Sequence, residues 1–474
     1  MHLHRIAVDF SKPIRPWDGF GVNYVEACQT RDYATNPQDY GGFSRLDARA
    51  RGEILDLTFG DDGLRPGIVK MFLDPWHQRE PGHDYDVDPH VLDERAYDHD
   101  ATTSNMLAFV QGGLERLARR GDALEAIVTL YGPPAWMTRQ RFVRGRDLDP
   151  ALKTEAAKYL IAWAKHLRDV TGLNVAYLSL HNEGEDWIRW PLDGSTDGDA
   201  GHDYNMYWPP EQVVDFLRFM PEMLAAHGLS DVRVTPGECT GWYRFQAWGY
   251  ADAIADDEQA LAGLGLVTSH GFKGGDIDGD WFNDWRSAGI DVLRARRPEL
   301  HAWVTSTSWS KMDVYFLEEM RQNIYAAKVN AIIPWATIQL QGHWEGGDPN
   351  PGTAFRVYED GRYEVTKGYH FLKQISRAGQ PGMSVCHAHA NDRRIGLVAF
   401  GGRGSRHPDA FVVLNLGDAE REFEVEVRGS DHAAFTAYRT SEDDDYVPAG
   451  AVDVSDGRIA VRAPPRSATT YFGR

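Results

Sequence analysis

Cysteine and long apolar runs are both scarce in this 474-residue chain. The three cysteines, Cys28, Cys239 and Cys386, lie far apart and lack the spacing of metal ligands. We therefore expect reduced, partly buried thiols and no disulfide scaffold. No apolar run approaches transmembrane length, and residues 1–8 lack the apolar core of a signal peptide. These absences predict a cytoplasmic protein that does not enter a membrane.

Positive charge is also in deficit, with 50 Lys and Arg against 70 Asp and Glu, which gives a formal net charge of −20. A strongly acidic chain argues against nucleic acid or an anionic membrane as its partner. The balance fits an enzyme that acts on a neutral ligand. The sequence does not indicate an oligomeric state.

Tryptophan, by contrast, is abundant, with 15 residues. Many of them fall in predicted loops: Trp76, Trp136, Trp187, Trp190, Trp208, Trp242, Trp281 and Trp344. Aromatic side chains could simply fill the core. Their position around predicted strand ends instead indicates platforms that stack on the apolar faces of sugars.

Short apolar runs alternate with amphipathic segments from about residue 20 to residue 370. The predicted strands lie near Gly19–Tyr24, Ile68–Phe72, Ala126–Tyr131, Val175–Leu180, Val232–Thr235, Leu264–Ser269, Ala302–Thr305 and Ala331–Trp335. Such runs are typical of strands that are buried on both faces of a parallel sheet. The pattern predicts an α/β fold, a (β/α)8 TIM barrel. A doubly wound open sheet is the alternative, but no glycine-rich phosphate loop follows the first strand.

Helical periodicity fills the intervals between these strands. The predicted helices span Ser44–Leu57, Met106–Leu117, Lys153–Arg168, Glu211–Leu224 and Val314–Val329. A capping box formed by Ser44 and Asp47 is expected to open the first of them.

After Gly368 the pattern changes to short β-branched and aromatic runs separated by turn residues. It predicts an antiparallel β-sandwich, which we expect the N-terminal strand Arg5–Phe10 to join. The predicted domains are therefore a catalytic barrel over residues 20–370 and a side domain built from residues 1–19 plus 371–474.

The segment Leu178–Gly184 ends a predicted strand with the pair Asn182 and Glu183. Catalytic carboxylates of barrel enzymes lie at such strand ends, where the side chain leaves the core. A Glu beside an Asn there suits a general acid held next to a sugar hydroxyl. The alternative is a solvated Glu in a loop.

Five segments together resemble glycoside hydrolase family 30, a clan A family of retaining β-glycosidases, over nearly the whole chain. They are Asp18–Asn23, Gly132–Met137, Leu178–Glu183, Tyr438–Ser441 and Pro464–Ser467. The resemblance implies that Glu183 is the acid/base residue. One departure is that Gly184 replaces the usual proline after it.

The larger departure is at the nucleophile. Retaining glycosidases use two carboxyl groups about 5–5.5 Å apart. The family carries a Trp-x-Thr-Glu-x-Ser pattern on its seventh strand, and here Ser306 occupies the Glu position in Trp303–Ser308. Serine cannot supply the missing negative charge, so we expect little or no hydrolysis.

Three interpretations of Ser306 stay open. The chain is a retaining β-glycosidase whose nucleophile has been replaced, or it is a natural non-catalytic carbohydrate-binding relative, or another carboxylate has taken over. The candidates for that carboxylate are Glu238, Asp74, Glu345 and Glu185.

The expected catalytic positions are Glu183 and Ser306, and the expected substrate-binding side chains are Asn182, Trp136, His270, Trp335, Asp74, Trp76, Glu238 and Trp187. His270 resembles the family's cleft histidine, although a packed rim histidine is the alternative. Trp335 could instead be a core aromatic, and Glu238 could hold a neighbouring side chain. Lys70 is expected either to orient the nucleophile or to snorkel.

No cofactor or metal is expected, since the pair His387 and His389 lacks a third ligand and is predicted to lie in a surface loop. The long loop 186–210 favours exo-action on short glycosides or oligosaccharides by double displacement.

Overall fold

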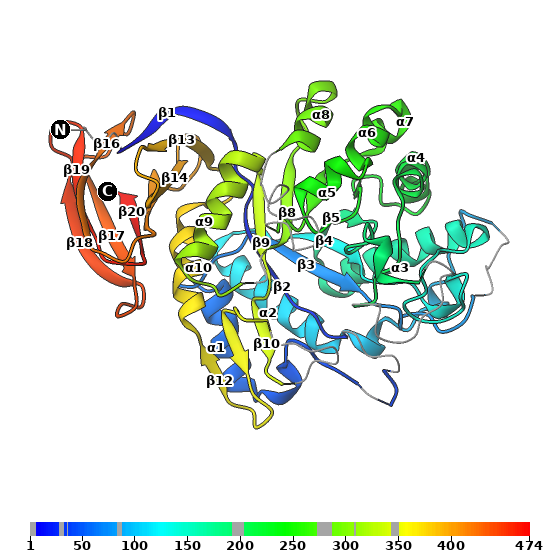
Figure 1. Ribbon diagram of the computed structural model, residues 1–474. Coiled ribbons are helices and arrows are strands. Elements are labelled where there is room, and N and C mark those ends of the chain that lie inside the picture. Colours follow the sequence, from blue (N-terminus) through cyan, green and yellow to red (C-terminus); the bar gives the residue numbers. More distant parts are fainter. Residues whose placement is uncertain are drawn as a thin grey trace.

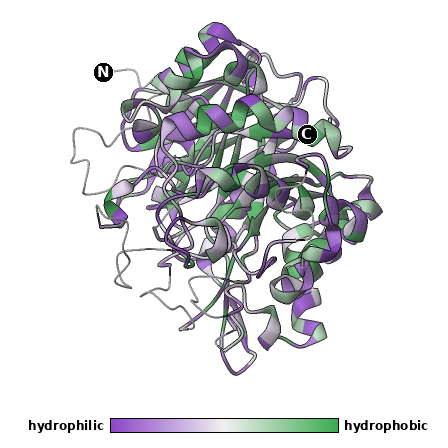
Figure 2. Ribbon diagram, turned by 90° about the vertical axis from the view of Figure 1, so that its right-hand side faces the viewer, coloured by the Kyte–Doolittle hydropathy of each residue, from purple (hydrophilic) through white to green (hydrophobic). Residues whose placement is uncertain are grey.

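The computed structural model describes residues 6–27, 33–35, 37–82, 88–191, 203–272, 287–307, 310–342 and 350–474. It consists of a barrel and a β-sandwich that lie side by side (Figure 1). Hydrophobic residues gather on the strands in the interior, whereas the surrounding helices carry both hydrophobic and hydrophilic residues (Figure 2). The predicted α/β fold with a sandwich side domain is confirmed.

Eight parallel strands form the barrel sheet in the order β6-β5-β4-β3-β2-β9-β8-β7. They are β2 (Gly19–Asn23), β3 (Ile68–Leu73), β4 (Glu125–Leu130), β5 (Asn174–Ser179), β6 (Arg233–Thr235), β7 (Val267–Ser269), β8 (Ala302–Thr307) and β9 (Ala331–Pro334). Parallel bridges between Val234 and Leu264 and between Cys239 and Ser269 join β6 to β7. These bridges close the barrel, so the open-sheet alternative is wrong.

Helices surround this sheet. They are α1 (Ala48–Phe59), α2 (Ser104–Arg120), α3 (Lys153–Thr171), α4 (Pro210–Ala226), α5 (Trp242–Ala247), α6 (Tyr250–Ala255), α7 (Glu258–Gly263), α8 (Ala288–Arg296), α9 (Val314–Gln322) and α10 (Lys367–Ala378). The predicted start of the first helix at Ser44 was wrong. Its cap is Asp47, whose carboxylate accepts a hydrogen bond from the Ala50 backbone N–H at 2.8 Å, while Ser44 lies in a preceding 3-10 turn.

The sandwich is one nine-stranded sheet in the order β18-β17-β20-β15-β14-β13-β1-β16-β19, folded around its own apolar core. Its strands are β1 (Ile6–Pro16), β13 (Ser384–Ala390), β14 (Ile395–Gly401), β15 (Ala410–Asn415), β16 (Arg421–Arg428), β17 (Ala434–Thr440), β18 (Val447–Asp453), β19 (Arg458–Ala463) and β20 (Ser467–Gly473). The N-terminal strand β1 pairs with β13 and β16, so both chain ends build this unit, as predicted.

Two features departed from the sequence prediction. His387 and His389 lie on the exposed face of strand β13, because this segment pairs with β1, and not in a loop. A small sheet of β10 (Ile338–Leu340), β11 (Phe355–Val357) and β12 (Tyr363–Val365) was not predicted, since three-residue strands carry little periodicity. Within the described ranges, no group of three or more His, Cys, Asp or Glu side chains could hold a metal ion.

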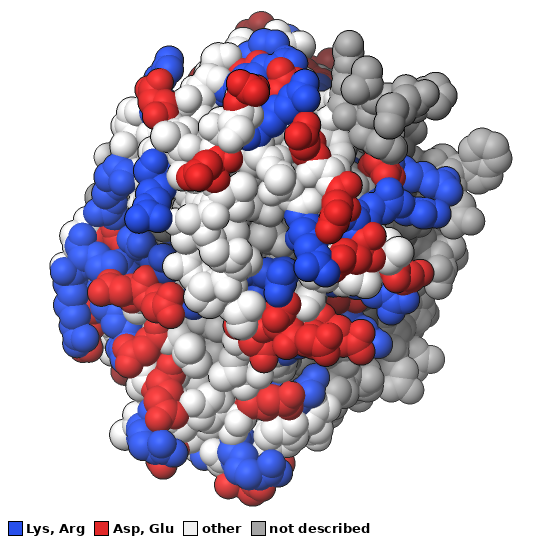
Figure 3. All heavy atoms as spheres, turned by 90° about the vertical axis from the view of Figure 1, so that its left-hand side faces the viewer, with Lys and Arg blue, Asp and Glu red and all other residues white. Residues whose placement is uncertain are grey.

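The described residues include two of the three cysteines. Cys239 and Cys386 are buried and free, as expected, whereas Cys28 lies outside the described residues. Among the described helices, none is long and apolar enough to cross a bilayer. Basic and acidic side chains are interspersed on the sandwich side of the molecule (Figure 3).

The two units meet at Trp17, between β1 and β2. Its ring centroid lies 5.0 Å from that of Phe20 in the barrel and 5.2 Å from that of Phe400 in the sandwich. Its indole N–H donates to the Gly379 carbonyl at 3.0 Å, directly after α10. Because the predicted boundary at residues 370 and 371 falls inside α10, we propose that α10 and Trp17 together form the joint.

Replacing Trp17 tests this joint. Trp17→Ala removes a fully buried ring from the core that contains both Phe20 and Phe400, and is expected to lower the free energy of unfolding by about 3–5 kcal/mol in urea. Ile14→Ala on the neighbouring strand β1, where the residue is 47% exposed, should change it by less than about 0.5 kcal/mol. Equal effects of the two substitutions would contradict the account.

Candidate active site at the carboxyl ends of the barrel strands

Four charged side chains and one threonine hydroxyl, from five consecutive barrel strands, meet inside and above the barrel. Lys70 lies on β3 and Thr129 on β4, while Glu183, Glu238 and His270 follow β5, β6 and β7. They lie above an apolar layer that contains Ile68, Ile127, Leu266, Trp303, Ala331 and Ile333. Active sites of (β/α)8 proteins lie at this end of the barrel.

Glu183 has a left-handed backbone with φ 43°, which is costly for a residue with a Cβ. Its N–H donates to the Glu238 carbonyl at 2.8 Å. The next residue, Gly184, donates its N–H to His181 Nδ1 at 3.0 Å. Proline has no N–H, so this bond gives a physical reason for the Gly184 departure from the family pattern. The loop thus holds the Glu183 side chain at a fixed place.

The Glu183 carboxylate is buried, with 7% of the residue exposed, and it contacts two cationic groups. Oε2 accepts a hydrogen bond from Arg189 Nη2 at 2.7 Å, and Oε1 lies 2.9 Å from His270 Nδ1. Glu183 is therefore neither a solvated loop residue nor an isolated carboxylate.

Glu238 is completely buried, and both of its oxygens are engaged. Oε1 accepts from Thr129 Oγ1 at 2.6 Å, while Oε2 pairs with Lys70 Nζ and lies 3.1 Å from His270 Nε2. Burial raises the pKa of Glu238, but Lys70 and His270 outweigh it and lower the value to about 2. Glu238 has the contacts of a carboxylate that holds its neighbours. Lys70 is fully buried, so the snorkelling expectation was wrong.

His270 bridges the two carboxylates through its two ring nitrogens. Burial and Lys70 lower the pKa of His270, but the hydrogen bonds to Glu183 and Glu238 outweigh them and raise it overall. Only the imidazolium form can donate to both carboxylates at once. The result is a charged chain of alternating sign that runs Lys70, Glu238, His270, Glu183 and Arg189.

Ser306 is the next-to-last residue of β8 and is 4% exposed. The pairing of β8 with β9 shifts register between Val304 and Thr307, which interrupts the regular alternation of side chains there. The preceding Thr305 hydroxyl donates to the Ser269 carbonyl at 3.3 Å. Ser306 and His270 thus follow two strand-end residues that contact each other.

Two of the other carboxylates proposed from the sequence accept hydrogen bonds from residues of other segments. Glu185 Oε1 accepts from the N–H and hydroxyl of Thr240 at 2.8 and 2.7 Å. Asp74 accepts from the Trp76 N–H at 2.9 Å and from the Thr102 hydroxyl at 2.7 Å. Glu345 lies outside the described residues.

An aromatic cluster lies beside the charged chain. Trp335, directly after β9, stacks on Tyr40 with ring centroids 5.2 Å apart and meets Phe72 edge-on at 6.1 Å. Tyr131 and Tyr204 belong to the same cluster. Trp76 packs against it and donates its indole N–H to the Tyr204 hydroxyl at 3.0 Å.

Three further residues predicted to bind substrate differ in how deeply they are buried. Asn182 is buried, and its Nδ2 lies 2.9 Å from the side-chain oxygen of Asn205. Trp136 is half-buried in the turn Ala135–Met137, and its indole N–H donates to the Gln78 carbonyl at 3.2 Å. Trp187 is 47% exposed at the start of the turn Trp187–Arg189.

Sequence reasoning missed Arg189 and Asn205. Both lie in the segment between β5 and α4, where no motif or spacing distinguishes them from ordinary polar loop residues. The only available signal was the position of Arg189 six residues after Glu183.

Comparison with solved structures places the whole chain in one architecture. The catalytic domain of GH30 xylanase C from Talaromyces cellulolyticus matches with a TM-score of 0.71 at 14% identity, over 99% of this chain and 100% of that one. SrfJ from Salmonella typhimurium matches at 0.70 and 15% identity, over 100% and 93%. The endo-β1,6-glucanase BT3312 matches at 0.68 and 16% identity, over 99% and 95%.

The fold is that of the GH30 structures. No family model matches the sequence, and no curated protein matches it. At these identities the likeness establishes the architecture, with its sandwich built from both chain ends, and the activity has to be argued from the site.

The buried pair of Lys70 and Glu238 is open to a double-mutant cycle. Lys70→Met should cost about 3–5 kcal/mol of unfolding free energy, because it leaves a buried carboxylate without its cation. The double variant with Glu238→Gln should cost clearly less than the sum of the two single changes. Lys12→Met, whose side chain is 64% exposed in its pair with Asp9, is the control and should cost less than about 1 kcal/mol. Additive effects at Lys70 and Glu238 would exclude a direct pair.

The buried His181 predicts a loss of stability in acid. Burial is the main reason that its pKa falls from 6.5 to about 3. The unfolded chain therefore binds this proton first, so the contribution is fully present above about pH 6.5 and is lost as the pH falls toward about 3. Urea unfolding of His181→Gln should depend on pH less steeply than that of the parent, by up to about 1.4 kcal/mol per pH unit. Identical slopes would show that folding does not lower the pKa of His181.

Proposed function

We propose that this protein is a glycoside hydrolase of the retaining β-glycosidase type, with Glu183 as the acid/base residue and Ser306 at the position of the nucleophile. The single observation that carries the proposal is the placement of Glu183. It is buried at the carboxyl end of β5, next to Asn182, and held from two sides by Arg189 and His270. Carbohydrate is the substrate class, which the adjoining aromatic cluster also supports.

In the proposed reaction, Glu183 protonates the leaving-group oxygen and later removes a proton from water. Asn182 donates to the sugar 2-hydroxyl, and Trp335 offers an aromatic face to the ring. In a retaining displacement a second carboxylate attacks the anomeric carbon as the protonated leaving group departs. Ser306 has no carboxylate, so the site lacks the nucleophile of this reaction.

A second candidate function is binding of carbohydrate without hydrolysis. It is favoured by the engaged state of the carboxylates, because Glu238 is inaccessible and Glu183 is paired with Arg189. On this alternative the charged chain orders the walls of a sugar-binding site and makes no bond to substrate.

Restoring a carboxylate at position 306 separates the two functions. Ser306→Glu should raise the hydrolysis of an aryl β-glycoside at least about a thousand-fold over the parent chain, because it supplies the nucleophile. The assay uses β-glucoside, β-xyloside, β-fucoside, β-galactoside and furanoside substrates. Ser306→Gln, which has nearly the size of Glu without its charge, is the matched control and should stay inactive.

The outcomes of this assay are distinct. Micromolar sugar binding without turnover in any variant would favour the binding protein. Rapid turnover by the parent chain would mean that the nucleophile lies elsewhere. Inversion of the anomeric centre by Ser306→Glu, followed by NMR of the first product, would contradict the retaining mechanism.

The action on longer substrates is part of the same proposal. Exo-action was expected from the loop 186–210, of which residues 192–202 lie outside the described residues. Release of only monosaccharide from an oligosaccharide by Ser306→Glu would support it, and a ladder of internal products would contradict it. The cytoplasmic location stays a prediction.

A further inference from the structure

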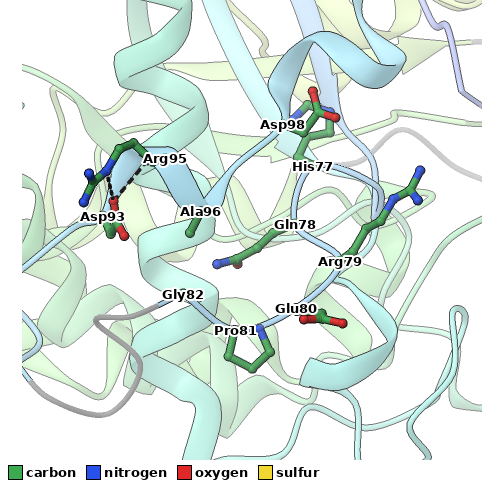
Figure 4. A pocket seen from close by; sticks show the side chains of 10 residues that line it. All are labelled: His77, Gln78, Arg79, Glu80, Pro81, Gly82, Asp93, Arg95, Ala96 and Asp98. Atoms are coloured by element: carbon green, nitrogen blue, oxygen red, sulfur yellow. Dashed lines mark hydrogen bonds and ion pairs between the residues drawn. The ribbon is translucent and has the colours of Figure 1, made fainter.

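A cavity lies between the segment 77–82, which follows β3, and the segment 93–98, which precedes α2. Its volume is about 640 Å³, which is within the range of small-molecule sites. Figure 4 shows the two segments facing each other across the hollow, with Gln78 extending between them. None of the proposed catalytic residues lines this cavity.

Gln78 is the feature that points to a ligand. The residue is 1% exposed, yet neither its side-chain oxygen nor its side-chain nitrogen has a hydrogen-bond partner. Leaving a buried amide unpaired costs free energy, and native structures rarely tolerate it without a ligand or water. The amide offers one acceptor and two donor hydrogens, a combination that suits vicinal hydroxyl groups.

The charges around the cavity indicate a neutral ligand. Arg79 and Arg95 are opposed by Glu80, Asp93 and Asp98, so the two signs nearly balance. Arg95 also pairs with Asp93, with 3.1 Å between Nε and Oδ1. A polyanion would need an excess of cations, and a cation would need carboxylates that are not already paired.

Trp136 links the cavity to the proposed active site. Its indole N–H donates to the backbone carbonyl of Gln78 at 3.2 Å. A ligand bound at Gln78 would therefore change the chemical environment of the indole. Trp136 itself follows β4, the strand that carries Thr129 of the charged chain. The cavity and the mouth are therefore neighbours on the same side of the barrel.

We propose that this cavity is a distal subsite that binds a neutral sugar residue, with the Gln78 amide donating to one hydroxyl and accepting from another. A saccharide held here would belong to the same chain that enters the barrel mouth. This last point rests on the proposed function, whereas sugar binding in the cavity does not.

One titration measures sugar binding in the cavity and at the barrel mouth separately. The probes are β-1,4-xylotetraose and β-1,6-linked glucotetraose, and the readout is the indole ¹H–¹⁵N resonances, assigned with Trp136→Phe and Trp335→Phe. The part of the Trp136 shift that Ala96→Phe abolishes reports on the cavity, because that substitution fills it, and Trp335 reports on the mouth. We expect a probe to shift the Trp136 resonance, and Gln78→Leu should weaken that binding at least about ten-fold.

Stability provides the matched control. Gln78→Leu removes an unpaired buried amide and should raise the melting temperature of the free protein or leave it unchanged. Gln374→Leu removes a buried amide that is fully paired with Thr440 and Thr470, at 2.8 and 2.6 Å, and should lower the melting temperature without changing sugar affinity. Ala96→Phe, which fills the cavity from its rim, should also abolish the Trp136 shift.

Several results would overturn the inference. A shift of Trp335 alone would leave the proposed function intact and exclude the subsite, whereas a shift of Trp136 alone would support the subsite and count against the proposed function. Unchanged affinity and a lower melting temperature in Gln78→Leu would make Gln78 a structural residue. A shift of Trp136 by inorganic phosphate, with none by either sugar, would contradict a neutral ligand.

Discussion

The buried contact between Lys70 and Glu238 is the constraint on which the site depends. An ammonium and a carboxylate inside a barrel are tolerated only when each is paired, since removing either partner leaves an unpaired buried charge. The second oxygen of Glu238 is fixed by Thr129, and His270 extends the pairing to Glu183. The rigid interior thus determines where the Glu183 carboxylate lies, although Glu183 itself is in a loop.

This chain of charges also explains what the site lacks. Lys70, His270 and Arg189 pair with Glu238 and Glu183, and Arg189 also pairs with Asp186, with 3.7 Å between Nε and Oδ2. The carboxylates of the centre are thus already paired, so none is left to stabilise a cationic transition state. A glutamate at position 306 would supply a further carboxylate next to the strand end that carries His270. With a carboxylate at position 306, the architecture would fit a hydrolase. With Ser306, it fits carbohydrate binding.

The barrel and the sandwich could be predicted because their information is local along the chain. Apolar runs such as Ile68–Leu73 and turn-separated β-branched segments such as Arg421–Arg428 reveal their periodicity within a few residues. The pairing of Lys70 with Glu238 could not be predicted, since 168 residues separate them and either residue could have had other partners. The His387 segment was misread as a loop because its strand character comes from pairing with β1 at the other end of the chain. Glu183 and His270 were expected at strand ends, whereas Arg189 and the unpaired amide of Gln78 depend on tertiary packing that no spacing encodes.

The protonation state of His270 tests the central claim most directly. The ¹⁵N chemical shifts of its two ring nitrogens can be followed across a pH titration of the intact protein, with His270→Gln used for assignment. We predict that both nitrogens carry protons at neutral pH, because each lies within hydrogen-bond distance of a carboxylate oxygen, at 2.9 and 3.1 Å, and these bonds raise the pKa of His270. A neutral ring with one unprotonated nitrogen at pH 7 would contradict it, because His270 could then not donate to Glu183 and Glu238 together.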